Sequence, residues 1–214
     1  MRLTKINRMY VLSFLFALHI SLSAYVNSTF LAQFVGEKYV GLLYTVASIL
    51  TLVLLSQSAK ILKYFGNRRL IMWLLLINMS ALAFLITSSS PNLIAVSFIS
   101  FISTNTLIFL CLDIFIEHFG NRATIGKTRG LYLTITNIAW MLSPLITANL
   151  IGRDGGYATV YLLAFITVVI MTLGLFLSVK HFKDKKYNRT PFLQTYKYLK
   201  TNHHMLSITE INFI

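Results

Sequence analysis

Apolar side chains gather into six long runs, and short polar segments separate them. The runs cover approximately residues 9–30, 39–62, 70–87, 93–115, 131–151 and 158–179. Each run is near the ~20 residues that a helix needs to cross the hydrocarbon core of a bilayer. Backbone N–H and C=O groups find no water in that core, so the runs are expected to be helical. The pattern predicts an all-α membrane protein with a six-span transmembrane bundle over residues 1–179.

The composition indicates that lipid surrounds this chain. Hydrophobic residues make up 56% of its 214 residues and charged residues only 12%, whereas soluble domains carry about 25% charged residues. A chain this apolar cannot cover its surface in water. The lipid bilayer is therefore its first expected partner.

The net charge of +13 is distributed unevenly along the chain. The segments before the first run, between the second and third, between the fourth and fifth, and after the sixth hold 17 of the 19 Lys and Arg residues, if Lys60 at the end of the second run is included. This alternation predicts a multi-pass protein of the cell (plasma) membrane with both termini cytoplasmic, and residues 180–214 as a basic cytoplasmic loop. A nucleic-acid-binding protein would carry its charge on one face of a soluble domain, so nucleic acid is not an expected partner.

Residue types that perform catalysis or bind metals do not cluster in the sequence. No motif that carries a serine nucleophile is present, and no paired His and Cys have the spacing of a metal site. The adjacent His203 and His204 have no acidic residues near them in the sequence, and Cys111 is the only cysteine. We therefore expect neither an enzyme nor a bound metal or cofactor.

Polar side chains inside the runs predict which helices face a watery cavity. The first and fourth runs are the most polar, whereas the third run, with Asn78 and Ser80, and the sixth are more apolar and are expected at the lipid periphery. The candidates for lining a cavity are His19, Tyr25, Asn27, Ser97, Ser100, Thr104, Asn105, Asn137 and Trp140. Each could instead form a polar contact between helices. For His19, a packing role is favoured over proton transfer because the first run contains no acid.

A charged stretch, "DIFIEHFGNRATIGKTRG" at residues 113–130, connects the fourth and fifth runs. Asp113 and Glu117 are four residues apart and share one helix face. Arg129 is among the cations that could pair with them. One interpretation is a salt-bridge network that acts as a cytoplasmic gate, and another is a static cluster that fixes the topology. Asp113 is also a candidate proton-binding group, because it lies about one turn inside the membrane boundary.

Three short motifs lie at or near the connections between runs. The stretch "AKILKYFGNRRL" at 59–70 contains Gly66, Arg68 and Arg69, and "FGNR" occurs again at 119–122. In both copies the Gly suits the left-handed turn that ends a helix. In the charged stretch, Glu117 precedes the pair Arg129 and Gly130. The fifth run contains "AWMLSPLITA", whose small residues around the proline suit close helix packing: Ala139, Ser143, Pro144, Thr147 and Ala148.

These motifs, in this order on six spans, resemble the amino-terminal half of major facilitator superfamily transporters. The resemblance implies two inverted three-helix units and a secondary active transporter that works by alternating access, with its substrate held between two six-helix halves. It implies an unknown small-molecule substrate, with the proton as a candidate coupling ion. Lys63 departs from the pattern, because an Asp usually stands at this position of the first motif. The small-residue face near Pro144 is expected to pack on the other half.

The last residues, "LSITEINFI" at 206–214, resemble the first turns of a seventh span. We therefore expect a truncated transporter, with the carboxy-terminal half as its missing partner. Two alternatives remain, a six-span protein that works as a homodimer and a non-transporting partner subunit.

Overall fold

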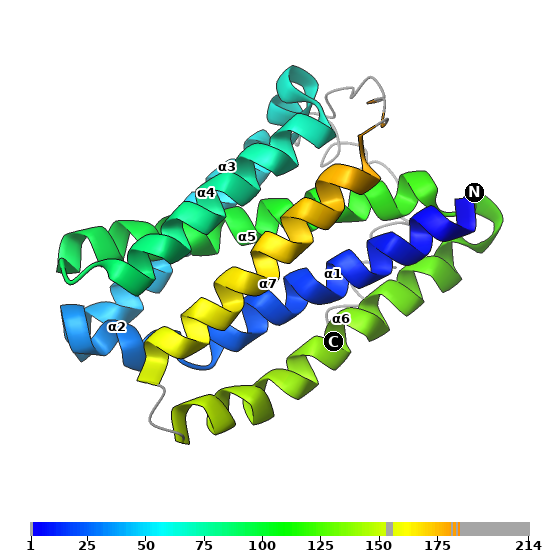
Figure 1. The fold of residues 1–214 in the computed structure, drawn as a ribbon. Helices are drawn as coiled ribbons and strands as arrows, with labels where there is room; N and C mark the ends of the chain where they lie inside the picture. Colours follow the sequence, from blue (N-terminus) through cyan, green and yellow to red (C-terminus); the bar gives the residue numbers. More distant parts are fainter. Residues whose placement is uncertain (1, 153–155, 181, 183, 185–214) are drawn as a thin grey trace, which may run out of the picture.

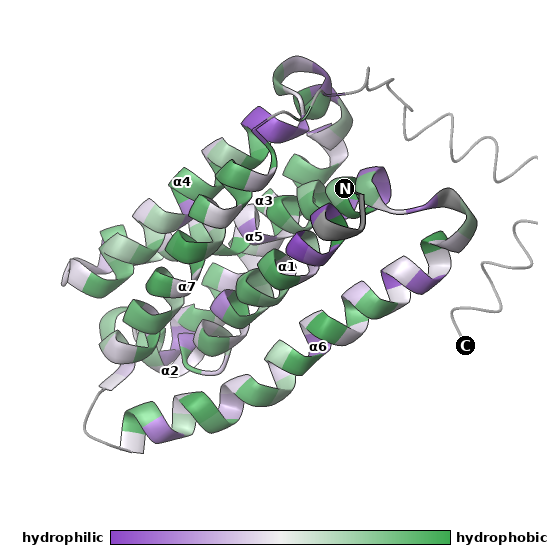
Figure 2. Ribbon diagram, turned by 45° about the vertical axis from the view of Figure 1, so that its right-hand side comes forward, coloured by the Kyte–Doolittle hydropathy of each residue, from purple (hydrophilic) through white to green (hydrophobic). Residues whose placement is uncertain are grey.

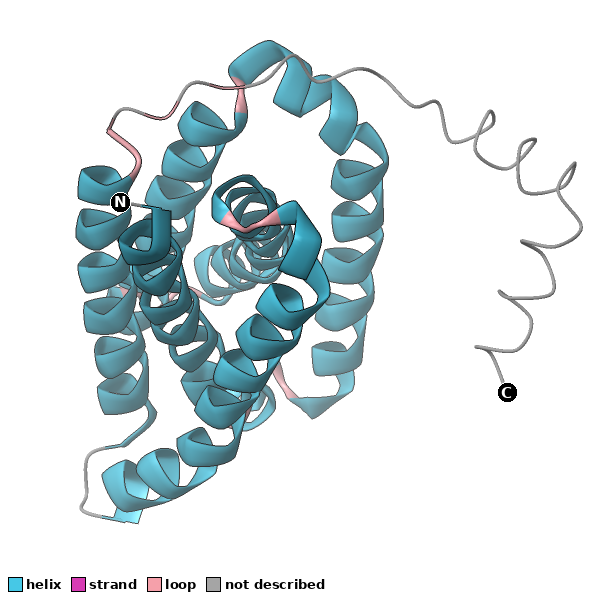
Figure 3. Ribbon diagram, turned by 90° about the vertical axis from the view of Figure 1, so that its right-hand side faces the viewer, coloured by secondary structure: helices cyan, strands magenta, loops and turns pink. Residues whose placement is uncertain are grey.

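Helices account for all the regular structure in the part of the chain that the computed structural model describes, residues 2–152, 156–180, 182 and 184. Figure 1 labels the seven α-helices, and Figure 3 shows them without any strand between them. A 3-10 turn, η1, precedes α6. In chain order the elements are α1 (Arg2–Ala24), α2 (Asn27–Val35), α3 (Glu37–Phe65), α4 (Asn67–Thr87), α5 (Pro91–Phe119), η1 (Arg122–Thr124), α6 (Ile125–Leu150) and α7 (Gly156–Ser178).

Six of these helices are long and apolar enough to cross a membrane, namely α1 and α3 to α7. The prediction of an all-α membrane fold with six spans is confirmed. The inverted relation of two three-helix units stays a prediction. Of the predicted segment 180–214, only Lys180, Phe182 and Asp184 lie within the described residues, and the seventh-span prediction falls outside them.

The first predicted run is not one helix. It breaks at Tyr25 and Val26, where the Val26 N–H bonds to Ser23 O at 3.0 Å, and the short α2 follows. The side chain of Asn27 is buried and accepts a hydrogen bond from Tyr161 Oη of α7 at 2.7 Å. The Phe30 ring also packs on Tyr161, with centroids 4.7 Å apart. These contacts with α7 hold α2, so the expectation of one continuous span over 9–30 was wrong.

Two single glycines connect α3 to its neighbours in sequence. Gly36 separates α2 from α3 with φ of 82°, and Gly66 separates α3 from α4 with φ of 75°. Side chains rarely adopt this left-handed region, so glycine is the residue that these turns need. The second "FGNR" copy behaves differently, because Gly120 has φ of −68°. The first copy therefore has the positive φ that needs glycine, but with ψ of 158° it does not form the expected αL turn, and the second copy has neither.

The helices α1 and α5 lie at the centre of the bundle. The first packs against α6 and α7, the second packs against α3 and α4, and α4 also contacts α7. Large side chains fill the interface between α1 and α5, where Phe16 of α1 meets the Phe109 ring at 4.9 Å between centroids and Phe101 meets His19. The first and fourth runs form the two most buried spans, and the watery cavity that the sequence predicts beside them stays a prediction.

The least buried spans are α3 and α6. Figure 2 shows α6 running along one side of the bundle, with green stretches interrupted by white and purple ones. The third and sixth runs, which were expected at the lipid periphery, form α4 and α7. Each packs on the other and on a central helix along one side, and each exposes large apolar side chains on another side, among them Trp73, Leu76, Leu173 and Leu177. Their contact with lipid stays a prediction. Hydropathy alone does not distinguish a helix that contacts lipid from one that contacts other helices.

Candidate functional sites

A network of buried polar side chains crosses the middle of the bundle. His19 of α1 is completely buried, and its Nε2 lies 2.9 Å from Asn78 Oδ1 of α4. Its Nδ1 lies 3.0 Å from the backbone oxygen of Ala164 in α7. Asn78 Nδ2 donates to Thr104 Oγ1 at 2.9 Å and to Asn105 Oδ1 at 2.8 Å, both on α5. The network therefore connects α1, α4, α5 and α7.

The surroundings of His19 are aromatic and uncharged. The Phe16 ring stacks on the imidazole at 5.6 Å, and Phe101 meets it edge-on at 5.4 Å. Asn105 Nδ2 is buried and has no hydrogen-bond partner among the described residues. An unpaired buried donor costs about 1–3 kcal/mol. This amide group would gain from any movement or ligand that brings an acceptor to it.

The nine cavity candidates fall into two groups. Five are buried, namely His19, Asn27, Ser97, Thr104 and Asn105, and Ser100 is half-buried with its hydroxyl bonded to its own helix at Val96 O. Three are exposed, namely Tyr25, Asn137 and Trp140. The rings of Tyr25 and Trp140 approach edge-on, with centroids 6.4 Å apart. The structure brings His19, Thr104 and Asn105 together and holds the Tyr25–Trp140 pair apart from them on the surface.

Sequence reasoning missed Asn78 as a functional candidate. Its side chain hydrogen-bonds to the side chains of three residues on two other helices, α1 and α5, and is completely buried. The available signal was its position as a lone amide in the middle of an apolar run. We discounted it because we placed that run at the periphery. A polar side chain in a span usually faces protein rather than lipid.

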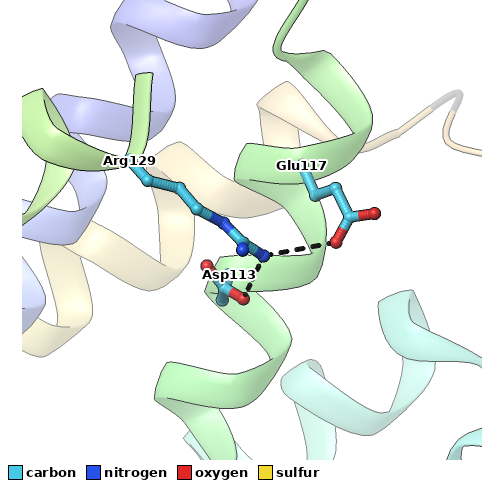
Figure 4. A network of polar contacts seen from close by, with 3 residues as sticks. All are labelled: Asp113, Glu117 and Arg129. Atoms are coloured by element: carbon cyan, nitrogen blue, oxygen red, sulfur yellow. Dashed lines mark hydrogen bonds and ion pairs between the residues drawn. The ribbon is translucent and has the colours of Figure 1, made fainter. Parts of the chain in front are cut away.

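Figure 4 shows the ion pairs of the charged stretch. Arg129 Nη2 of α6 lies 3.1 Å from Asp113 Oδ2 and 3.4 Å from Glu117 Oε2, and both acids are on α5. The side chains are exposed by 47%, 39% and 66% respectively. Exposed pairs of this kind contribute about 0–1 kcal/mol.

The other residues of the gate prediction do not join these ion pairs. Arg68 and Arg69 lie in the first turn of α4, and among the described residues neither forms an ion pair with Asp113 or Glu117. Gly130 follows Arg129 on an exposed face, with open space where a Cβ would lie. Both partners of the ion pairs belong to this one bundle, so the observed contacts connect α5 to α6.

The small-residue face of α6 packs on α1. Ala139, Ser143 and Thr147 are buried, and Ser21 Oγ donates to Ala139 O at 3.4 Å. Thr147 Oγ1 donates to the backbone oxygen of Leu22 at 3.4 Å. Small side chains at intervals of four residues allow this close approach. Our expectation that this face meets a second half was wrong for these three residues. Pro144 is half-buried and Ala148 is exposed.

Comparison with known proteins gives one finding. The family described as the Major Facilitator Superfamily matches residues 9–213. No curated protein and no solved structure matches the chain.

Proposed function

Because the chain belongs to the Major Facilitator Superfamily, a family of membrane transport proteins and not of enzymes, we propose that it forms one six-helix body of a secondary active transporter. The observation that carries this proposal is the family match over residues 9–213 on six apolar helices. In such transporters two bodies rock about a substrate held near the middle of the bilayer. A second body, the expected carboxy-terminal half, then supplies the other wall of the site.

The buried polar network supports rocking as a rigid unit. It bonds four helices through the side chains of His19, Asn78 and Asn105. Two helices outside this network, α3 and α6, are the least buried. We assign their exposed sides to contact with the second body. At the Asp113 end of the bundle, Gly66, Arg68 and Arg69 are the proposed contact residues.

The exposed aromatic and amide side chains on α6 and at the end of α1 are our proposed part of the substrate cavity. Tyr25, Asn137 and Trp140 offer stacking surfaces together with hydrogen-bonding groups, as small-molecule sites require. In this proposal the buried candidates His19, Thr104 and Asn105 belong to the hydrogen-bond network that holds the helices of the cavity wall in place. The ion pairs of Arg129 with Asp113 and Glu117 connect α5 to α6. A gate movement that separates these two helices would therefore have to break these ion pairs.

A homodimer is the second candidate function, and one observation favours it. The helix α3 exposes a stripe of large apolar side chains that a second copy could cover: Leu42, Val46, Ile49, Leu52 and Val53. Within lipid this stripe also needs no protein partner.

The test measures uptake of labelled sugars, amino acids, organic acids, peptides and cationic drugs into liposomes. One set of liposomes holds the chain alone, and another holds the chain joined to the carboxy-terminal half of a family member, each with and without a proton gradient. We expect saturable uptake only in the joined protein and a loss of it in Trp140→Ala. Saturable uptake by the chain alone would support the homodimer. Uptake that is unchanged by Tyr25→Ala, Asn137→Ala and Trp140→Ala would contradict the assigned cavity.

A further inference from the structure

The chain beyond α7 returns to the bundle at Asp184. Asp184 Oδ1 accepts a hydrogen bond from the backbone N–H of Asn67 at 2.7 Å, across 117 positions of sequence. Asn67 is the first residue of α4, and Gly66 precedes it. A Cβ on Gly66 would lie 2.5 Å from Asp184 Oδ2. Glycine therefore leaves the space that the carboxylate occupies.

A second contact lies two residues earlier, at Phe182. Its ring meets the rings of Phe115 and His118 in the last turns of α5, both at 4.8 Å between centroids, and Phe119 at 5.9 Å. The Lys5 ammonium of α1 lies 5.7 Å above the Phe119 ring. Phe182 thus packs into an aromatic cluster that also contacts the beginning of the chain.

Electrostatics explain why the carboxylate of Asp184 lies at the N-terminus of α4. A helix N-terminus carries a partial positive charge. The first turn of α4 contains no acid and adds the charges of Arg68 and Arg69. Lys63, in the last turn of α3, stands at the motif position where related transporters usually have Asp. Asp113 and Glu117 lie against Arg129, so Asp184 supplies negative charge where the local sequence has none.

We propose that Phe182 and Asp184 form a clasp that fastens the segment after α7 to α4 and α5. In this arrangement Asp184 replaces, from a distant part of the chain, the acid that position 63 lacks. The mechanical consequence rests on the proposed function. Because Asp184 lies against the first residue of α4 and Phe182 against the last turns of α5, these two residues move together with α4 and α5 as one piece.

The first experiment isolates the hydrogen bond between Asp184 and the Asn67 N–H. Asn67→Pro removes this N–H at the first helical position, where proline is well tolerated. Asn67→Ala keeps the N–H, and both variants lose the side-chain bond from Asn67 Nδ2 to Cys111 O. The midpoint of thermal unfolding is measured for both variants of the 214-residue chain in detergent. We expect Asn67→Pro to unfold at a lower temperature than Asn67→Ala.

The same pair is then measured with Asp184→Ala, where the difference between Asn67→Pro and Asn67→Ala should disappear. Glu37→Gln, which removes an acid from the first turn of α3, is the matched control and should leave the difference intact. A difference that persists without Asp184 would overturn the capping role.

The second experiment locates the segment without any transport assay. Benzoylphenylalanine replaces Phe182, and irradiation should give adducts that map to residues 115–119. The same probe at Phe176, an exposed position of α7, should react with detergent or lipid instead. Asp184→Ala should lower the adduct yield at 182 about threefold, since a charge at a helix terminus contributes 0.3–1 kcal/mol. Adducts elsewhere, or a yield that Asp184→Ala does not change, would overturn the clasp. Failure of transport with the adducts intact would instead count against the proposed function.

Discussion

His19 and Asn78 lie 59 positions apart in the sequence and meet at 2.9 Å in the interior of the bundle. The contact joins a central helix to one that hydropathy alone assigns to the periphery. Asn78 in turn donates to Thr104 and Asn105. One amide thus organises the polar contacts among four helices.

Replacing Asn78 with leucine should destabilise the chain by about 1–2 kcal/mol, because interhelical hydrogen bonds in membranes are worth up to this amount and three partners lose theirs. The measurement is unfolding of the purified chain in mixed micelles by a denaturing detergent. Ser80→Leu is the control, since the Ser80 hydroxyl is exposed and bonds only its own helix at Leu76 O and Ile77 O. Equal effects of the two substitutions would show that the network does not stabilise the bundle.

His19 and Asn78 should also be coupled in a double-mutant cycle. Each single change to leucine leaves the other side chain buried without its partner, so the double variant should lose less stability than the sum of the two single changes. Strict additivity would mean that the two residues act through separate contacts.

Gly174 of α7 sits directly against α1. A Cβ at this position would lie 2.8 Å from Leu12 Cδ2. Gly174→Ala should be mild, because the end of the leucine side chain can move. Gly174→Leu should cost about 1–3 kcal/mol through overpacking. Gly41→Leu, in a helix with open space at that point, is the control, and unfolding curves of all three variants make the comparison.

The ion pairs between α5 and α6 should contribute little to stability. Asp113→Asn and Arg129→Gln should each change the unfolding free energy by less than about 1 kcal/mol, because these side chains are exposed. Their coupling should fall further in 1 M salt, which screens exposed charges. A coupling that exceeds this limit and resists salt would indicate that the pair is shielded from water in the membrane.

The predicted topology gives a labelling experiment on intact cells. In a Cys111→Ser background, Ser90→Cys and Arg69→Cys place exposed thiols at the α4–α5 and α3–α4 connections, near opposite ends of α4. An impermeant thiol reagent applied outside should label Ser90→Cys alone. Labelling of Arg69→Cys in unbroken cells would reverse the orientation that the charge distribution predicts.

Run length and hydropathy were sufficient to predict the six spans, because the bilayer imposes the length of each helix. They could not predict the break before Asn27, since that break depends on Tyr161, which is 134 positions away. The same limit applies to α4 and α7. Their sequences are apolar all round, and only tertiary contacts show which side of each helix packs on other helices and which side is exposed.

For the candidate sites, local spacing performed better than residue type. Asp113 and Glu117, four residues apart, do share an arginine, as their helical periodicity predicts. The assignment of polar side chains to a cavity remains a prediction. Five of the nine candidates are buried, and a sequence does not distinguish an amide that faces water from one that faces another amide.

The two glycines that bound α3 have different freedom. A Cβ added to Gly36 would have no atom within 4 Å, whereas a Cβ added to Gly66 would collide with the Asp184 carboxylate. Between them, α3 is the least buried of the six spans. The connection of α3 to α2 at Gly36 is therefore open, whereas its connection to α4 at Gly66 is covered by Asp184. Withdrawal of Asp184 would open the space beside Gly66, and the packing of α3 on α5 would then be the main contact that holds α3 in place.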